Sequence, residues 1–325
     1  MRARNKIILG CLLTLVSWIA CGQEEPFQFS SPSRMTNDEL LLSLVAPTGR
    51  TYRIESATTP LLWGGQFTFP TNAKTSLQYT DSATPYLAGR LYRAVRVDGT
   101  NLVWGDHLIT TNGDVIIQPR NHATFVMQWN GNMIYVDPTP TASYAGLPKG
   151  DLVLVTHNHS DHFSSSTIES VRKTNANIIV PRTIYNSGLT AAQKSMALPL
   201  AYGESTNVLG LNVEAVYAYN SNHAPLGFGN GYVVTIGGKR IYISGDTGNS
   251  ADLRALTNID VAFLCINLPF TMSVNEATNL VRAMQPKVVY PYHYRDQSNA
   301  TTNAAAFKQR LGTDTGIEVR LRKWY

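Results

Sequence analysis

Apolar positions along the chain follow two different patterns, one before and one after about residue 100. Between residues 37 and 100 the apolar, β-branched and aromatic runs are short, and turn-forming residues such as Pro47, Gly49 and Pro70 separate them. Short runs bounded by proline and glycine are typical of strands. We therefore predict a small all-β module over residues 37–100, with strands at residues 40–45, 51–56, 66–69, 76–79 and 91–97.

After residue 101, runs with strand and helix periodicity alternate, which is typical of a layered α/β domain. The continuous apolar run at residues 151–156 predicts a strand that is covered on both faces. Residues 165–175 and 274–285 have the pattern of helices. Further strands, two of them in a hairpin across Gly237-Gly238, are predicted at residues 115–118, 124–129, 133–136, 178–180, 232–236, 240–244, 261–266 and 287–290.

The first residues carry the pattern of an export signal. Basic residues precede an apolar run at residues 7–20, which is too short for a comfortable membrane span and fits the core of a signal peptide. The run ends in the letters IACG, which resemble a bacterial lipobox with Cys21 as the lipid attachment point. Ordinary signal cleavage without a lipid is the alternative. We predict a signal peptide at residues 1–21, a linker at 22–36, and an exported protein, periplasmic or at the cell surface, anchored to the membrane through Cys21.

Composition and charge limit which partners we expect and whether disulfides hold the fold together. Hydrophobic residues make up 43% of the chain, enough to bury a sizeable core. Part of the formal charge of +5 lies in the basic start of the signal segment, and no stripe of basic and aromatic residues follows, so no nucleic-acid partner is expected. Of the 3 cysteines, only Cys265 remains as a candidate free thiol after export, which excludes a disulfide framework. Cys265 lies in an apolar run, and we predict that it is buried.

The strongest chemical signal is the segment THNHSDH at residues 156–162, directly after an apolar strand. It contains His157, His159, Asp161 and His162, and imidazole and carboxylate groups are ligands for zinc or a similar first-row metal. In an extended backbone, residues two apart point the same way, so His157, His159 and Asp161 would converge on one point. His162 would then face the other side and reach a neighbouring point.

Three further positions have the same chemistry. His223 lies in a loop rich in Gly, Asn and Pro just before a predicted strand, whereas Asp246 and His293 each follow a strand. Loop ends on a rigid sheet can hold ligand side chains in fixed positions. Alone, each of these residues would be structural, but beside residues 156–162 they complete a candidate set of metal ligands.

The order His-x-His-x-Asp-His, His, Asp, His is similar to that of the metallo-β-lactamase superfamily, over roughly residues 122–294. The letters NHATF at 121–125 and YVDP at 135–138 resemble the branch that contains ascorbate-phosphate lactonase and N-acyl-phosphatidylethanolamine phospholipase D. This resemblance implies an α/β fold, a four-layer αβ/βα sandwich, over residues 101–325. The strands of residues 37–100 resemble a small immunoglobulin-like module, for which we expect a spacer or packing role.

The resemblance also implies how the ligands divide between two divalent metals. One metal would be bound by His157, His159 and His223. The second would be bound by Asp161, His162 and His293, with Asp246 bridging the two. Zinc is the metal that we expect, with Mn²⁺, Ni²⁺ or Fe²⁺ as alternatives.

Residues beside the ligands have less specific roles. Asp137 matches an aspartate that supports the metal loop from behind the ligands. His122 has either a role at the pocket or a packing role. Asn220, Tyr292 and Tyr294 would either contact substrate or support a ligand. The same two roles stay open for Arg295.

The implied activity is hydrolysis. A hydroxide shared by the two metals would attack a lactone, ester or phosphodiester, with Asp161 orienting the nucleophile and passing a proton to the leaving group. The substrate would be a small or lipid-like molecule. Alternatives are a β-lactamase, a non-catalytic cell-surface binding lipoprotein on a hydrolase scaffold, and a di-iron redox protein. The redox class is disfavoured because His159 stands where those proteins have glutamate and no flavin domain follows. The sequence carries no signal for an oligomeric state.

Overall fold

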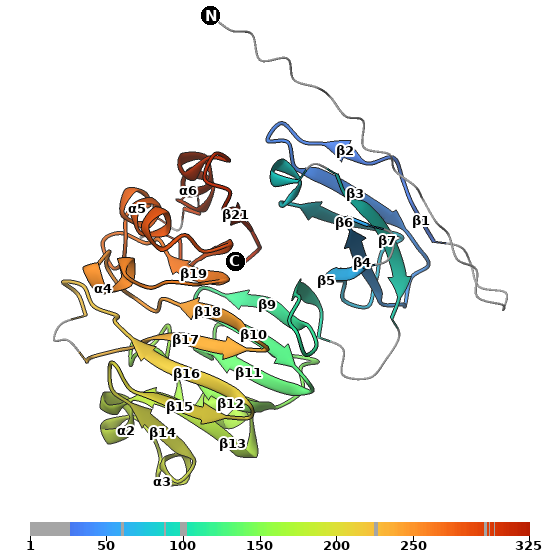
Figure 1. The fold of residues 1–325 in the computed structure, drawn as a ribbon. Coiled ribbons are helices and arrows are strands. Elements are labelled where there is room, and N and C mark those ends of the chain that lie inside the picture. Colours follow the sequence, from blue (N-terminus) through green and yellow to red (C-terminus); the bar gives the residue numbers. More distant parts are fainter. Residues whose placement is uncertain are drawn as a thin grey trace, which may run out of the picture. The chain divides into compact units, whose positions relative to one another are not determined.

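A computed structural model describes residues 27–59, 62–87, 89–97, 103–223, 227–295, 298, 300–301 and 303–325 (Figure 1). The predicted signal peptide and Cys21 lie outside these residues. The chain divides into two compact units, Met1–Thr100 and Asn101–Tyr325. Among the helices in the described part of the chain, none is both long and apolar enough to cross a membrane.

The first unit is built almost entirely of strands in the residues described. These are β1 (Gln28–Phe29), β2 (Ser33–Arg34), β3 (Leu40–Val45), β4 (Tyr52–Ala57), β5 (Gly64–Thr68), β6 (Ser76–Asp81) and β7 (Leu91–Arg96), with one 3-10 turn, η1 (Thr84–Tyr86). Strand β3 pairs with β1, β2 and β6, whereas β4 pairs with β5 and β7. Buried side chains from both sets of strands, such as Leu44 and Ile54, share one apolar cluster.

Two short strands correct the linker prediction for residues 22–36. Residues 28–29 and 33–34 pair antiparallel with β3 instead of forming a free tether. The sequence pattern missed them because each strand is only two residues long. The immunoglobulin-like character of this unit stays a prediction.

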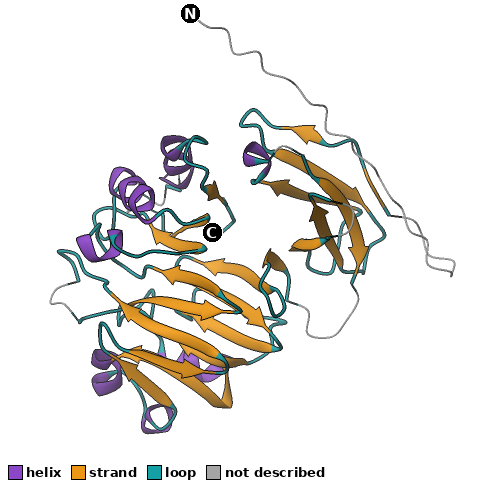
Figure 2. Cartoon of the chain, in the orientation of Figure 1, coloured by secondary structure: helices purple, strands orange, loops and turns teal. Residues whose placement is uncertain are grey.

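Two sheets form the second unit (Figure 2). One contains β8 (Gly105–Leu108), β9 (Val115–Asn121), β10 (Thr124–Trp129), β11 (Asn132–Val136), β12 (Gly150–Leu154), β13 (Arg172–Pro181) and β14 (Ala197–Leu200), each hydrogen-bonded to the next. The other contains β15 (Ser205–Val208), β16 (Leu211–Val216), β17 (Gly231–Ile236), β18 (Lys239–Ile243), β19 (Val261–Cys265), β20 (Val288–Tyr292) and β21 (Glu318–Val319), also in chain order. The helices are α1 (Ser165–Val171), α2 (Arg182–Ser187), α3 (Ala191–Lys194), α4 (Ala251–Arg254), α5 (Val274–Met284) and α6 (Asn303–Leu311).

Alternation along the strands explains the layers of this unit. Successive side chains of a strand point to opposite faces of its sheet. In β10, Phe125 belongs to the core between the sheets, where its ring stacks on Phe263 of β19 with centroids 4.1 Å apart. The next residue, Val126, belongs to a second cluster that includes Ile168 of α1 and Ile184 of α2. Side chains of α5 and α6 pack from the other side of the second sheet, so helices cover both outer faces. This arrangement confirms the predicted α/β sandwich class.

Most predicted elements of this unit are present, with one clear error. The hairpin across Gly237-Gly238 forms between β17 and β18, and α5 ends at Met284, followed by Gln285 in a left-handed conformation. The helix predicted over residues 165–175 is wrong beyond Val171. Residues from Arg172 onward form β13, which pairs in parallel with β12. Pairing with a buried neighbouring strand therefore overrides the helical pattern there.

Candidate metal centre

Loops at the ends of strands bring the candidate ligands together. Residues 157–162 follow β12, Asp246 follows β18, and His293 follows β20. Strands β18, β19 and β20 pair in parallel, so their carboxyl ends lie on one edge of the sheet. The loop before β17 contributes His223.

The segment of residues 157–162 turns back instead of staying extended. The backbone amides of His162 and Phe163 both donate to the carbonyl of His159, at 3.0 and 2.8 Å. The expectation that Asp161 converges with His157 and His159 is therefore wrong, because it assumed extended backbone. The turn separates the pair His157 and His159 from the pair Asp161 and His162.

Histidine and aspartate side chains gather in two groups. In each group, the candidate ligand atoms all lie within 4.8 Å of one another. The first group is His157, His159, His223 and Asp246. The second group is His122, Asp161, His162 and His293. The chain has 7 histidines, and all but His107 belong to these groups.

Asp246 joins the two groups through its two carboxylate oxygens. Its Oδ2 lies 3.4 Å from Nε2 of His223 and 3.9 Å from Nε2 of His157, both in the first group. Its Oδ1 lies 3.2 Å from Nε2 of His162 and 3.4 Å from Nε2 of His293, both in the second group. This geometry brings together the seven ligand positions in the division that the superfamily resemblance implied.

Several ligand atoms in these groups are buried without a partner. Among the described residues, Nε2 of His157, His162 and His293 and Oδ1 of Asp246 have no hydrogen-bond partner. A buried polar atom left unpaired costs about 1–3 kcal/mol, and more when charged. Divalent cations between these atoms would satisfy all of them, so the residues fit a metal centre.

Asp137 supports the second group from behind. Its Oδ2 lies 2.7 Å from Nδ1 of His162, and its Oδ1 accepts the backbone N–H of Thr156 at 2.7 Å. Asp137 is fully buried. A carboxylate at Nδ1 keeps the proton on that nitrogen and leaves the lone pair of Nε2 for a metal.

Asn220 holds His223 in a similar way, through an acceptor oxygen at Nδ1, whereas Asn267 brings its amide nitrogen to His293. Oδ1 of Asn220 lies 2.8 Å from Nδ1 of His223, and its Nδ2 donates to the carbonyl of Phe270 at 2.8 Å. The side-chain amide of Asn267 lies 3.4 Å from Nδ1 of His293. Of the two roles open for Asn220, these contacts favour support of a ligand. Asn267 was missed because it stands 26 residues before its histidine.

Neither tyrosine beside His293 is placed for contact with a substrate. Tyr292 is fully buried, and its hydroxyl accepts the backbone N–H of Gly245 at 2.9 Å, next to Asp246. The hydroxyl of Tyr294 donates to the carbonyl of Arg322 at 3.3 Å. Of the two roles open for Tyr292 and Tyr294, burial and these hydrogen bonds favour support over contact with a substrate. Arg295 lies with its guanidinium carbon 3.9 Å from the ring centre of Tyr325.

Close approach of two glycines shapes the ligand loops. A Cβ at Gly229 would lie 2.7 Å from Cβ of His157 and 2.9 Å from the carbonyl oxygen of Thr156. A Cβ at Gly245, where φ is +56°, would lie 3.0 Å from Cβ of Thr156. Both positions need glycine because a side chain there would clash with the backbone or side chains of Thr156 and His157. The sequence alone does not reveal these close approaches.

Burial and neighbouring charges perturb the pKa values of the site. Burial, with the charge of His162, lowers the pKa of His157 and favours its neutral, metal-binding form. Burial opposes charge on His162 as well, but Asp246 and Asp137 outweigh it and raise the pKa of His162. Burial would raise the pKa of Asp246, but His293 and His162 outweigh it and lower that pKa. The metal-free site therefore holds protons that a metal would displace.

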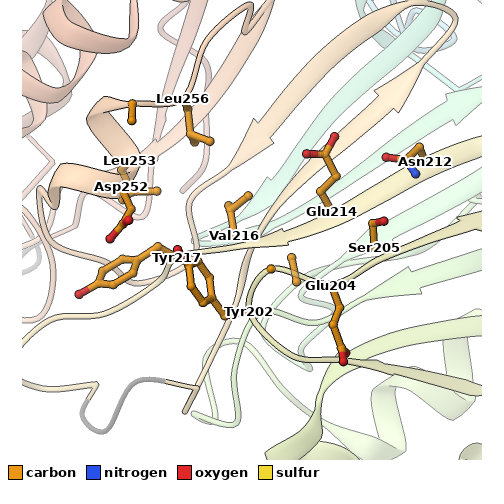
Figure 3. A pocket seen from close by; sticks show the side chains of 13 residues that line it. Tyr202, Glu204, Ser205, Asn212, Glu214, Val216, Tyr217, Asp252, Leu253 and Leu256 are labelled. Atoms are coloured by element: carbon orange, nitrogen blue, oxygen red, sulfur yellow. The ribbon is translucent and has the colours of Figure 1, made fainter.

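Cys265 and a surface cavity lie outside this chemistry. Burial raises the pKa of the Cys265 thiol to about 11, which confirms the predicted inert, buried cysteine. A cavity of about 510 Å³ is lined by residues of β15, β16, α4 and the adjoining loops, including Glu214, Tyr217 and Asp252 (Figure 3). No candidate ligand lines this cavity.

Comparisons with known proteins agree with the fold and the ligand groups. The family model of the β-lactamase superfamily domain matches residues 117–293. The UPF0173 metal-dependent hydrolase of Nanoarchaeum equitans is 30% identical over 209 residues, which cover 62% of this chain and 94% of the relative.

Two solved structures are similar as well. A crystal structure from Parabacteroides distasonis, described as a candidate metal-dependent hydrolase, is 32% identical with a TM-score of 0.61, covering 68% of this chain and 99% of that one. Igni18, a metallo hydrolase from Ignicoccus hospitalis, is 26% identical with a TM-score of 0.56, covering 64% of this chain and 95% of that one. The chain belongs to the metallo-β-lactamase superfamily and, within it, to the UPF0173 family of metal-dependent hydrolases.

Proposed function

We propose that this hydrolase is binuclear, with one divalent metal at each ligand group and zinc as the metal at both. The observation that carries the proposal is the position of Asp246, whose Oδ1 faces the second group and whose Oδ2 faces the first. Neutral imidazoles and carboxylates are the ligands that zinc prefers in catalytic sites. When bound, such metals supply Lewis-acid catalysis and lower the pKa of water enough for hydrolysis at neutral pH.

The residues of the chain supply positioning and proton transfer. The metals would be held by Asp161, Asp246 and the histidines His157, His159, His162, His223 and His293. Asp137 and Asn220 would keep His162 and His223 in place. The side chain of Asp161 is 46% exposed, whereas those of Asp246 and Asp137 are buried. Asp161 is therefore the carboxylate that can meet both solvent and substrate. We propose that it orients the attacking water and passes a proton to the leaving group.

For the substrate we propose a lactone, an ester or a phosphodiester. The segments of residues 121–125 and 135–138 support this class through their resemblance to the lactonase and phospholipase D branch. A β-lactam is the second candidate, supported only by the superfamily.

Metal content and hydrolysis, measured together, test the proposal. The protein is analysed by metal mass spectrometry and assayed with a bis-aryl phosphodiester, an acyl-homoserine lactone and a chromogenic cephalosporin. We expect about two zinc ions per chain and chelator-sensitive turnover of one of the first two substrates. His157→Ala should lose both metal and turnover. His107→Gln, which changes the histidine outside the groups, should lose neither.

Other outcomes would overturn parts of this proposal. Turnover of the cephalosporin alone would favour a β-lactamase. Iron with visible absorption would favour redox chemistry. Wild-type protein without metal would favour a binding protein on a hydrolase scaffold.

We also propose that the protein is exported and anchored to the membrane through a lipid on Cys21. The IACG motif after an apolar run supports this proposal. Metabolic labelling with a fatty acid should mark the wild-type protein and not the Cys21→Ser variant. Equal labelling of both would refute the anchor.

A further inference from the structure

A chain of hydrogen bonds leads from the backbone to the exposed carboxylate of the second group. The backbone N–H of Arg295 donates to the hydroxyl of Tyr325 at 3.2 Å. That hydroxyl lies 2.8 Å from Nδ1 of His122. Nε2 of His122 lies 3.1 Å from Oδ2 of Asp161. Four residues that are far apart in sequence are thus linked in one series.

The donors and acceptors of this series fix its direction. The carboxylate of Asp161 can only accept, so Nε2 of His122 carries the ring proton and donates to it. In the neutral ring Nδ1 is then an acceptor. The hydroxyl of Tyr325, which accepts from Arg295, donates its one hydrogen to that nitrogen. Each group in the series has a partner, and hydrogen bonds in series strengthen one another.

His122 differs in this respect from the histidines proposed as ligands. Both ring nitrogens of His122 have hydrogen-bond partners, Tyr325 at Nδ1 and Asp161 at Nε2. Nε2 of His157, His162 and His293 has none, although Nε2 of His293 lies 3.4 Å from the same Asp161 oxygen. With both nitrogens engaged, His122 has the contacts of a residue that holds a ligand. We propose that Tyr325 and His122 are positioning residues of the second group: the Tyr325 hydroxyl fixes the His122 ring, which fixes the carboxylate of Asp161. This inference rests on the proposed binuclear function.

The surroundings hold His122 firmly in an uncommon conformation. Its φ is 55°, in the left-handed region that non-glycine residues seldom adopt. Its backbone N–H donates to the carbonyl of Trp324 at 3.1 Å, and its own carbonyl accepts the N–H of His293 at 3.2 Å. Trp324 is fully buried, with its ring centre 5.5 Å from that of Tyr292. Strained residues persist where their neighbours over-determine them, which is common at functional sites.

Asp161 is the ligand that most needs such a partner. Its side chain is 46% exposed, so packing alone does not immobilise it. An outer partner that orients a ligand typically contributes 10–100-fold to metal affinity. Loss of the Tyr325 hydroxyl should therefore weaken one metal more than the other.

Matched variants of the full-length protein test this inference. Tyr325→Phe removes the hydroxyl and keeps the ring, and His122→Leu removes the bond to Asp161. His122→Gln restores an N–H donor. Glutamine and leucine meet the same positive φ at this position, so the two variants differ in the donor and not in backbone strain. Tyr144→Phe is the control, because its hydroxyl donates to the carbonyl of Thr139 at 2.7 Å, away from this series. The readouts are stepwise Zn²⁺ affinities against a chromogenic chelator and the visible spectrum of the Co²⁺-loaded protein.

We expect Tyr325→Phe and His122→Leu to lower the affinity for one of the two metals about 10–100-fold and to alter the Co²⁺ spectrum. The other metal should bind as in wild type. His122→Gln should recover part of the loss, and Tyr144→Phe should show none. Unchanged affinities in Tyr325→Phe and His122→Leu would overturn the inference, as would an equal loss of both metals. A wild-type protein that binds no metal would instead refute the binuclear function on which the inference rests.

Discussion

Replacing Asp137 with asparagine tests whether the buried carboxylate behind His162 is what makes the second group a metal site. Asp137 is fully buried and its Oδ2 lies 2.7 Å from Nδ1 of His162. Asparagine keeps the size and one oxygen, which can still accept the N–H of Thr156, but the negative charge is lost. Asp246 and Asp137 raise the pKa of His162, and burial raises the pKa of Asp137, so the metal-free protein holds a proton between Asp137 and His162.

The magnitude follows from that burial. Breaking a buried ion pair by removing one partner costs about 3–5 kcal/mol. We therefore expect the free energy of unfolding of the metal-free protein to fall by about this amount. Loss of the orienting bond should also lower the affinity for one metal about 10–100-fold.

Two assays and one control separate these effects. Urea denaturation of metal-free protein gives the stability change, and chelator competition gives the metal affinities. Asp114→Asn is the control, because Asp114 lies 2.8 Å from Nδ1 of His107, with its side chain 30% exposed and outside both groups. That variant should lose at most about 1 kcal/mol and no metal affinity. If Asp137→Asn loses stability but binds both metals as tightly as wild type, Asp137 is a packing residue and the reasoning is wrong.

Three further results are expected. Gly229→Ala should weaken metal binding at the first group by displacing His157, since its Cβ would meet that residue at 2.7 Å, and chelator competition showing wild-type affinity would contradict this. Metal uptake in lightly buffered solution should release protons, because His162 has a raised pKa and must lose its proton to bind a metal. The affinity for metal should therefore fall from about pH 8 to about pH 6. Equal affinity at both pH values would be inconsistent with this. The guanidinium of Arg322 makes two bonds of 2.7 and 2.9 Å to the buried Asp106. Arg322→Met should therefore lower the free energy of unfolding, measured with urea, by about 3–5 kcal/mol. Its metal content should stay at the wild-type level.

The candidate ligands could be named from the sequence because imidazole and carboxylate groups are common metal ligands. The division of the ligands into two groups could not, because the turn at residues 157–162 depends on backbone bonds to His159 that no periodicity reveals. Reasoning from an extended strand placed Asp161 with His157. The superfamily resemblance implied the division that the geometry shows. The division known for the family already reflects a backbone that turns at this segment.

The same limit applies to support from distant parts of the chain. Tyr325 and His122 are 203 residues apart, and only the fold brings the hydroxyl to the ring. Gly229 looks like an ordinary loop glycine until the carbonyl of Thr156 is found 2.9 Å from where a Cβ would be. The predicted helix at residues 165–175 failed beyond Val171 for a related reason, since pairing of β13 with β12 is a long-range contact.

Backbone strain is distributed unequally between the two ligand groups. His122, Asp137 and His293 have φ values of 55°, 43° and 47°, and all three serve the second group. In the described part of the chain, no ligand of the first group has a positive φ. Strain of this kind costs about 1–3 kcal/mol at each residue and has to be balanced by surrounding contacts.

Those contacts reach well beyond the ligands themselves. The carbonyl of Trp324 binds the N–H of His122, and the carbonyl of Leu154 binds the N–H of Asp137 at 2.9 Å. The N–H of His293 binds the carbonyl of His122. A small loss of packing near Trp324 should therefore relax the second group before the first. The two metals of one site would then differ in their sensitivity to remote substitutions, although Asp246 touches both groups.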